Sequence, residues 1–311
     1  MTAKFRLVTR SDFDGLVCAV LLKEQDLIDE ILFVHPKDMQ DGKVPITSND
    51  ITTNLPYVPD CHLAFDHHAS ELKRISGQPE NYVISADAPS AARVVYEYYG
   101  GAKAFPRISE EMMAAVDQAD SAQYSLDDIL HPKGWTLLNY LMDARTGLGR
   151  FREFRVSNYQ LMMQLIDYCR DHDIGEILQL PDVKERADLY HAQQTLARAQ
   201  IENCARQHGS TVVLDLREEN TIYATNRFFL YALFPAASVS IHVMWGKDRQ
   251  NTALAVGKSI LNRSAKIHVG NLCLQYGGGG HAAAGTCQVD HDNVDKVLGE
   301  LLQAIAAADR Q

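Results

Sequence analysis

A short apolar run that leads into an acidic residue and two histidines constrains the fold of this chain more than any other segment. Residues 62–65 (His-Leu-Ala-Phe) have the length and character of a buried strand. Asp66, His67 and His68 follow directly. Open α/β sheets bind their ligands beyond the carboxyl ends of their strands. The segment therefore predicts an α/β sheet with one carboxylate and two imidazoles at its ligand-binding edge.

The N-terminal part of the sequence predicts the rest of such a sheet. Residues 4–9 favour a strand, the polar loop after them ends at Gly15, and residues 16–25 favour an apolar helix. A strand, a loop and a helix in this order open a parallel βαβ unit. Further strands are predicted at residues 31–35, 44–49 and 82–85, and helices at residues 90–99 and from residue 109 onward.

A helical stretch divides the sequence into two domains. Residues 143–209 favour helix throughout, and after Gly209 the pattern changes. Strands are predicted at residues 211–216, 221–225, 238–245 and 252–256, and helices at residues 269–276 and 293–307. We therefore predict an α/β protein of two domains: a mainly parallel sheet flanked by helices in residues 1–185, a linker helix in 186–209 and a smaller C-terminal α/β domain in 210–311. The alternative is that the linker is one more core helix.

Composition limits the partners and the compartment of this protein. Lysine and arginine number 30 and aspartate and glutamate 40 among 311 residues, a net charge of −10. Long nucleic acids bind extended basic tracks, so this balance argues against them. The six cysteines form no C-x-x-C pair, the N-terminus lacks a signal-peptide core, and no apolar run is long enough for a membrane span. We expect a cytoplasmic protein that binds neither membranes nor long nucleic acids.

Acidic residues follow several of the predicted strands. Asp12 and Asp14 stand two apart, so in an extended loop both side chains point the same way. Asp50 follows the predicted strand 44–49, as Asp66 follows residues 62–65. Carboxylates gathered at one sheet edge repel each other unless cations lie between them. Oxygen and imidazole ligands together suit Mn²⁺ better than Mg²⁺. Taken singly, each motif is more often a turn or a helix cap.

In this order the motifs resemble those of the DHH phosphoesterases, hydrolases of phosphodiester and phosphoanhydride bonds. The similar segments are Asp12-Phe13-Asp14-Gly15, Asp50, Asp66-His67-His68, and Asp120 with Asp117 as the alternative. The resemblance implies that Asp14, Asp50, His67 and Asp120 hold one divalent cation, and that Asp12 and a bridging Asp50 hold a second. It also implies that Asp66 orients an imidazole and that His68 contacts the scissile phosphate.

Two residues near the first motif qualify this resemblance. Many family members carry a histidine four residues before the first aspartate, where this chain has Val8. One cation would therefore lose a protein ligand. Arg10 lies in the same loop, and an arginine there can meet a phosphate or pair with a neighbouring carboxylate.

The glycine run near the C-terminus resembles the substrate-binding motif of the domain that accompanies many DHH proteins. The implied substrate-binding residues are Ser259, Asn262, Arg263, Gly278, Gly279, Gly280 and His281. Peptide N–H groups without side chains in the way can cradle a phosphate. The alternative for four consecutive glycines is a flexible turn.

The resemblance implies a phosphodiesterase with two divalent cations, Mn²⁺ in the first place and Mg²⁺ or Co²⁺ as alternatives. Its substrates would be short oligoribonucleotides or linear dinucleotides such as pGpG, cleaved to nucleoside monophosphates. One alternative is an exopolyphosphatase, which would need basic residues along a cleft; the candidates are Arg145, Arg150, Arg152, Arg155, Lys258, Arg263 and Lys266. Another is a non-catalytic nucleotide-binding module. A monomer and a homodimer both remain open.

Overall fold

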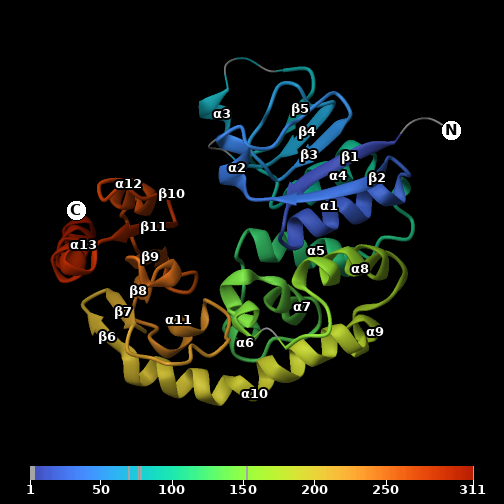
Figure 1. Ribbon diagram of the computed structural model, residues 1–311. Coiled ribbons are helices and arrows are strands. Elements are labelled where there is room, and N and C mark those ends of the chain that lie inside the picture. The colour runs from blue at the N-terminus through green and yellow to red at the C-terminus, as the bar shows by residue number, and fades with distance from the viewer. Residues whose placement is uncertain (1–3, 69–70, 76, 78, 152, 311) are drawn as a thin grey trace. The chain divides into compact units, whose positions relative to one another are not determined.

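The computed structural model describes residues 4–68, 71–75, 77, 79–151 and 153–310. Arg152 lies outside these residues. The chain forms two compact units, coloured mainly blue to green and yellow to red in Figure 1. Unit 1 comprises Met1–Gln123, Pro132–Ala144 and Leu148–Asp188, and unit 2 comprises Tyr124–His131, Arg145–Gly147 and Leu189–Gln311. The units therefore divide near residue 188, but two short earlier segments belong to unit 2.

Unit 1 is built on a parallel sheet in the order β2-β1-β3-β4-β5. The strands are β1 (Phe5–Arg10), β2 (Ile28–Val34), β3 (Asp50–Thr53), β4 (Leu63–Asp66) and β5 (Tyr82–Ile84). Helices α1 (Phe13–Glu24) and α4 (Ala91–Tyr98) pack along this sheet and against each other (Figure 1). Residues 13–22 of α1 are all buried, which explains the apolar sequence of this helix. The parallel sheet flanked by helices confirms the predicted fold class.

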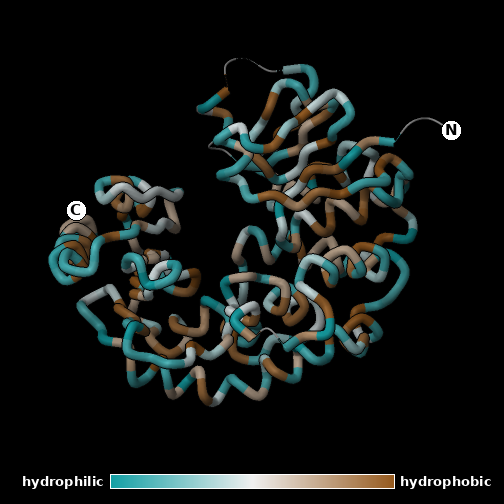
Figure 2. Tube along the Cα trace, in the orientation of Figure 1, coloured by the Kyte–Doolittle hydropathy of each residue, from teal (hydrophilic) through white to brown (hydrophobic). Residues whose placement is uncertain are grey.

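The remaining helices of unit 1 extend it beyond the sheet. Ser109 caps the helix that carries Asp120, and Ser157 forms a capping box with Gln160. These helices are α2 (Pro36–Gln40), α3 (Glu71–Arg74), α5 (Glu110–Asp120), α7 (Gly134–Met142), α8 (Asn158–Asp171) and α9 (Ile174–Gln179). The long helix α10 (Pro181–Cys204) carries residues of both units, and hydrophilic and hydrophobic positions alternate along it (Figure 2). Its buried Arg186 donates to the carbonyl oxygens of Asp182 and Val156.

Unit 2 contains a mixed sheet in the order β10-β11-β9-β8-β7-β6. Only β7 and β8 run parallel among its described pairs. Its strands are β6 (Ala205–His208), β7 (Thr211–Asp215), β8 (Val239–Trp245), β9 (Thr252–Lys258), β10 (Gly279–Gly280) and β11 (Ala284–Val289). Its helices are α6 (Leu126–Leu130), α11 (Phe229–Leu233), α12 (Val269–Leu274) and α13 (Val294–Asp309). Leu254, Val269 and Leu301 belong to one buried core between sheet and helices.

Several predicted elements differ from the structure. Residues 44–49 are not a strand, because Pro45 lacks an N–H and the N–H of Thr47 is taken by the Asp50 side chain at 2.7 Å. Residues 221–225 are not a strand either, since the N–H groups of Tyr223 and Ala224 bond to glutamine side chains of α10. The predicted linker helix ends at Cys204, and residues 205–208 form β6.

Among the described residues, no helix combines the length and the apolar character that a membrane crossing requires.

Candidate metal centre

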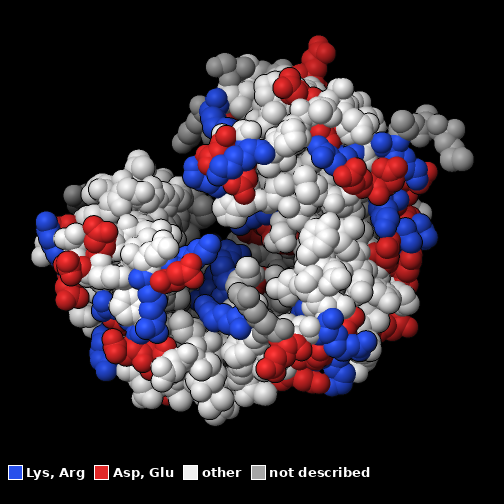
Figure 3. Space-filling model, viewed as in Figure 1, with Lys and Arg blue, Asp and Glu red and all other residues white. Residues whose placement is uncertain are grey.

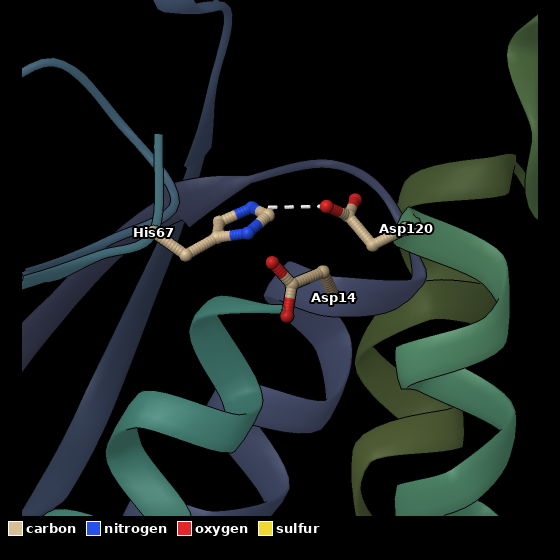
Figure 4. A group of neighbouring side chains, drawn as sticks. All are labelled: Asp14, His67 and Asp120. Atoms are coloured by element: carbon tan, nitrogen blue, oxygen red, sulfur yellow. Dashed lines mark ion pairs between the residues drawn. The ribbon is translucent and has the colours of Figure 1, made fainter. Parts of the chain in front are cut away.

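Three of the predicted ligands meet at the carboxyl edge of the parallel sheet. Asp14 lies in the first turn of α1, His67 directly follows β4, and Asp120 ends α5. One ligand atom of each lies within 4.8 Å of the others, and all three side chains point toward one another in Figure 4. His67 Nε2 is 2.9 Å from a carboxylate oxygen of Asp120. Two carboxylates and an imidazole in this arrangement are a suitable ligand set for a divalent transition-metal ion.

Asp14 is held by the start of a helix. Its two carboxylate oxygens accept the N–H groups of Ala91 at 3.0 Å and Ala92 at 2.7 Å, in the first turn of α4. The side chain is 2% exposed. Burial, followed by the charges of Asp120 and Asp12, raises the pKa of Asp14 well above its ordinary value. A cation at this position would keep the carboxylate ionised.

His67 has one ring nitrogen fixed by the backbone. Its Nδ1 lies 3.2 Å from the carbonyl oxygen of Ala88, so Nδ1 carries the proton and Nε2 faces Asp120. Burial works to lower the pKa of His67, but Asp120 and Asp14 outweigh it and raise the pKa to about 9. Burial likewise works to raise the pKa of Asp120, but His67 lowers it overall. This orientation aims the lone pair of a neutral His67 at the space where a cation would bind.

Asp66 anchors the backbone and the second histidine. Its Oδ1 accepts the N–H of His67 at 2.8 Å and Nδ1 of His68 at 2.7 Å, and its Oδ2 accepts the hydroxyl of Tyr82 at 3.0 Å. Asp66 is completely buried, whereas 40% of the His68 side chain is exposed. The carboxylate therefore orients the His68 ring and leaves Nε2 as the outer nitrogen.

Asp12 lies beside this cluster and is surrounded by donors. It caps α1 by accepting the N–H of Gly15 at 2.9 Å, and it accepts Nδ2 of Asn54 at 3.1 Å. Nε of Arg10 lies 2.9 Å from its other carboxylate oxygen. Of the two interactions expected for Arg10, the structure contains the one with a carboxylate. Asp117 is not part of the cluster, because its carboxylate accepts from Ser90 and Arg93 instead.

The prediction that Asp50 holds a cation is wrong. Asp50 is the first residue of β3 and pairs in register with Arg6 near the start of β1, whereas Thr53 pairs with Thr9. Because a strand rises about 3.3 Å per residue, Asp50 lies roughly 10 Å along the strand from its carboxyl end at Thr53. Its carboxylate instead binds Nε of Arg6 at 2.6 Å.

Asn54 stands at the position that Asp50 was expected to occupy. It directly follows β3, is 1% exposed and has a positive φ of 54°. Its Oδ1 is buried and has no partner among the described residues. The sequence analysis missed it, although it follows the β-branched run Ile51-Thr52-Thr53 just as Asp66 follows an apolar run. Val8, where a histidine was noted as missing, is buried against Met39 and Leu55.

In unit 2 the predicted substrate-binding residues fall into two segments. Ser259 Oγ accepts the N–H of Asn262 at 2.9 Å, and Nε of Arg263 donates to the carbonyl of Ile260. Gly278, Gly279, Gly280 and His281 run along the edge of β11.

Gly278 and Gly280 of this run are required by close packing, not by flexibility. A Cβ on Gly278 would lie 2.1 Å from the carbonyl oxygen of Thr286, and a Cβ on Gly280 would lie 2.2 Å from that of Ala284. Gly280 also has a φ of +146°. The alanine run that follows, expected to be helical, enters β11 at Ala284.

Much of the visible face is uncharged, and in several places positive and negative side chains stand side by side (Figure 3). Exposed pairs such as Lys37 with Asp41 and Lys43 with Asp38 are of this kind.

The comparisons with known proteins agree with this geometry. A pGpG-specific phosphodiesterase from Vibrio cholerae is 59% identical, with 98% of this chain and 100% of that chain covered and a TM-score of 0.86. Two more distant structures share the fold alone. One is a DHH domain described as a member of a family of ribosomal proteins, at 12% identity and TM-score 0.54, with 97% of this chain and 86% of that chain covered. The other is RecJ from Thermus thermophilus in complex with Mn²⁺, at 14% identity and TM-score 0.53, with 98% of this chain and 52% of that chain covered. No protein-family model matches the sequence, and no curated protein matches it.

Proposed function

This chain belongs to the DHH family of phosphoesterases, and on that basis we propose that it hydrolyses pGpG and similar short linear oligoribonucleotides to nucleoside monophosphates. The observation that carries the proposal is the full-length, 59% identical relative with that substrate, together with the cluster of Asp14, His67 and Asp120. The reaction would depend on divalent cations. Mn²⁺ is the preferred ion, because imidazole and carboxylate ligands together suit it.

Asp14, His67 and Asp120 would hold the cation. Their fit is supported by the raised pKa of the buried Asp14, which a positive charge would reverse, and by the fixed tautomer of His67. A divalent cation at such a site supplies Lewis acidity: it lowers the pKa of a bound water and offsets negative charge on the phosphate. The helix start of α4 holds Asp14 in place, so the ligand geometry is set before any ion binds.

His68 would act on the phosphate. Its Nδ1–H donates to Asp66, so Nε2 is the nitrogen left for substrate. A protonated Nε2 would donate a hydrogen bond to a non-bridging phosphate oxygen and offset the charge that develops there. Asp66 would be a positioning residue, because its carboxylate orients the ring and is itself buried.

The glycine run and its neighbours would bind the other end of the substrate. The peptide groups at Gly278, Gly279 and Gly280 would bind a phosphate, and the open space beside Gly279, where nothing lies within 4 Å of a Cβ position, supports this. His281 is exposed, and its Nδ1 accepts the N–H of Ala283 at 3.3 Å, which turns Nε2 outward. Ser259 and Asn262 would shape the segment that presents Arg263.

Product analysis tests this proposal. The purified protein is incubated with Mn²⁺ and, separately, with pGpG, a longer oligoribonucleotide and polyphosphate. We expect guanosine monophosphate from pGpG, little cleavage of the longer chain, and no turnover after chelation. Asp14→Asn should abolish turnover, whereas Lys23→Gln, which changes a charge in the exposed pair with Asp167, should not. Orthophosphate release from polyphosphate alone would identify an exopolyphosphatase, and binding without turnover would identify a nucleotide-binding module.

A further inference from the structure

Two neighbouring side chains donate to Asp12, whereas the hydrogen bonds described above for Asp14 come from backbone N–H groups. The two oxygens of Asp12 face three hydrogen-bond donors: the N–H of Gly15, the amide nitrogen of Asn54 and Nε of Arg10. A carboxylate that shares a metal ion needs further ligands with lone pairs nearby. The side chains of Arg10 and Asn54 offer N–H groups to Asp12 instead.

Asn54 strengthens this difference. It directly follows β3, next to the end of β1 that leads to Asp12, and its side chain is uncharged. If the side-chain amide were rotated by half a turn, its Oδ1 would face the Asp12 carboxylate, and two hydrogen-bond acceptors would repel each other. The amide is therefore fixed as a donor to Asp12, and the strand end that would supply a bridging carboxylate supplies none. Asp50 cannot replace it, since it is bound to Arg6 at the opposite end of the strand.

Arg10 completes the arrangement. It is the last residue of β1, its side chain is 37% exposed, and its guanidinium contacts Asp12. A guanidinium is always charged and carries five N–H donors, so the contact with Asp12 leaves others for a phosphate oxygen.

We propose that Arg10 takes the place of the second cation in this chain, so that the site works with one divalent ion, held by Asp14, His67 and Asp120, and one fixed guanidinium. The balance of charge favours one divalent ion rather than two. Asp12, Asp14 and Asp120 carry three negative charges when ionised, and one divalent ion and one guanidinium offset them. The role of Arg10 on the phosphate rests on the proposed function, but the number of cations does not.

The number of bound ions tests the proposal directly. The metal-free protein is titrated with Mn²⁺ by calorimetry, and free Mn²⁺ is followed by electron paramagnetic resonance. We expect one Mn²⁺ per chain for the wild type and for Arg10→Gln. The double variant Arg10→Gln, Asn54→Asp removes the guanidinium and adds a carboxylate at the strand end, so it should bind a second Mn²⁺.

Activity provides the second readout. Arg10→Gln should lower kcat about 100-fold, Arg10→Lys less, and added guanidinium ion should restore part of the rate of Arg10→Gln. Lys23→Gln is the matched control for loss of one exposed positive charge and should retain wild-type binding and turnover. Circular dichroism and the melting temperature show that each variant is folded.

Each outcome decides the question. Two Mn²⁺ ions per wild-type chain, bound with similar affinity, would overturn the proposal. So would wild-type turnover in Arg10→Gln. If pGpG is not hydrolysed at all but one Mn²⁺ binds and the double variant gains a second, the cation count stands and only the substrate assignment fails.

Discussion

Replacing Asp50 with alanine is expected to lower stability and to leave catalysis intact. The Asp50 carboxylate accepts two hydrogen bonds from Arg6, at 2.6 and 3.0 Å, and two from Thr47, at 2.7 and 3.1 Å. Asp50 is 1% exposed, whereas 22% of the Arg6 side chain is exposed. Removing one partner of a fully buried ion pair costs about 3–5 kcal/mol, and the partial exposure of Arg6 reduces this to about 2–3 kcal/mol.

The effect should depend on pH. Burial works to raise the pKa of Asp50, but the hydrogen bonds from Arg6 and Thr47 outweigh it and lower the pKa below its ordinary value of 3.8. A carboxylate with a lowered pKa contributes stability that is fully present above its unfolded pKa and is lost as the pH falls through the folded one. The difference between wild type and Asp50→Ala should therefore be constant near neutral pH and shrink below about pH 4.

The assay is urea unfolding followed by circular dichroism, with pGpG turnover and Mn²⁺ binding measured at a temperature where the variant is folded. Asp50→Asn is the matched variant, since it keeps the shape and an acceptor for Thr47 but loses the charge. Its loss of stability should be intermediate. A variant that unfolds at the wild-type urea concentration but has lost turnover or a bound cation would refute the assignment of Asp50 to a structural ion pair.

Two further predictions concern the other regions described above. Gly280→Ala should raise KM for pGpG about tenfold with a smaller effect on kcat, because its Cβ would lie 2.2 Å from the carbonyl oxygen of Ala284; Gly299→Ala in α13 is the control, since nothing lies within 4 Å of its Cβ and it is not part of the proposed binding segments. Steady-state kinetics distinguish them, and equal KM values would remove the glycine run from substrate binding. Arg186→Ala should cost about 3 kcal/mol in urea unfolding, because it removes a completely buried side chain and the donor to the carbonyl oxygen of Val156; an unchanged midpoint would contradict this.

Much of the fold could be predicted because the signals were local. The apolar run before Asp66 and the apolar helix after Asp14 are each recognisable from their own residues. They were enough to predict a parallel sheet and to place these two residues at its carboxyl edge. The error at Asp50 arose from a displacement of one strand by a few residues. Both 44–49 and Asp50–Thr53 contain β-branched residues, and nothing local says which of them pairs with β1.

The ligand set was harder to predict, because it depends on contacts between distant segments. Asp120 lies at the end of a helix more than fifty residues after His67, and only the resemblance to known hydrolases indicated it. The neighbouring Asp117 has the same chemistry, and its contacts with Ser90 and Arg93 could not be deduced from spacing. Asn54 was missed because an amide at a strand end is usually a turn residue.

The anchoring of Asp14 by the first turn of α4 limits how this site can diversify. The same two oxygens that would bind the ion also satisfy the N–H groups of Ala91 and Ala92, so any replacement at position 14 disturbs helix docking and chemistry together. The side chains of Arg10 and Asn54 do not hold a helix in place in this way. Natural variation or laboratory evolution toward another metal or another phosphate ester would therefore proceed through Arg10 and Asn54, with Asp14 unchanged.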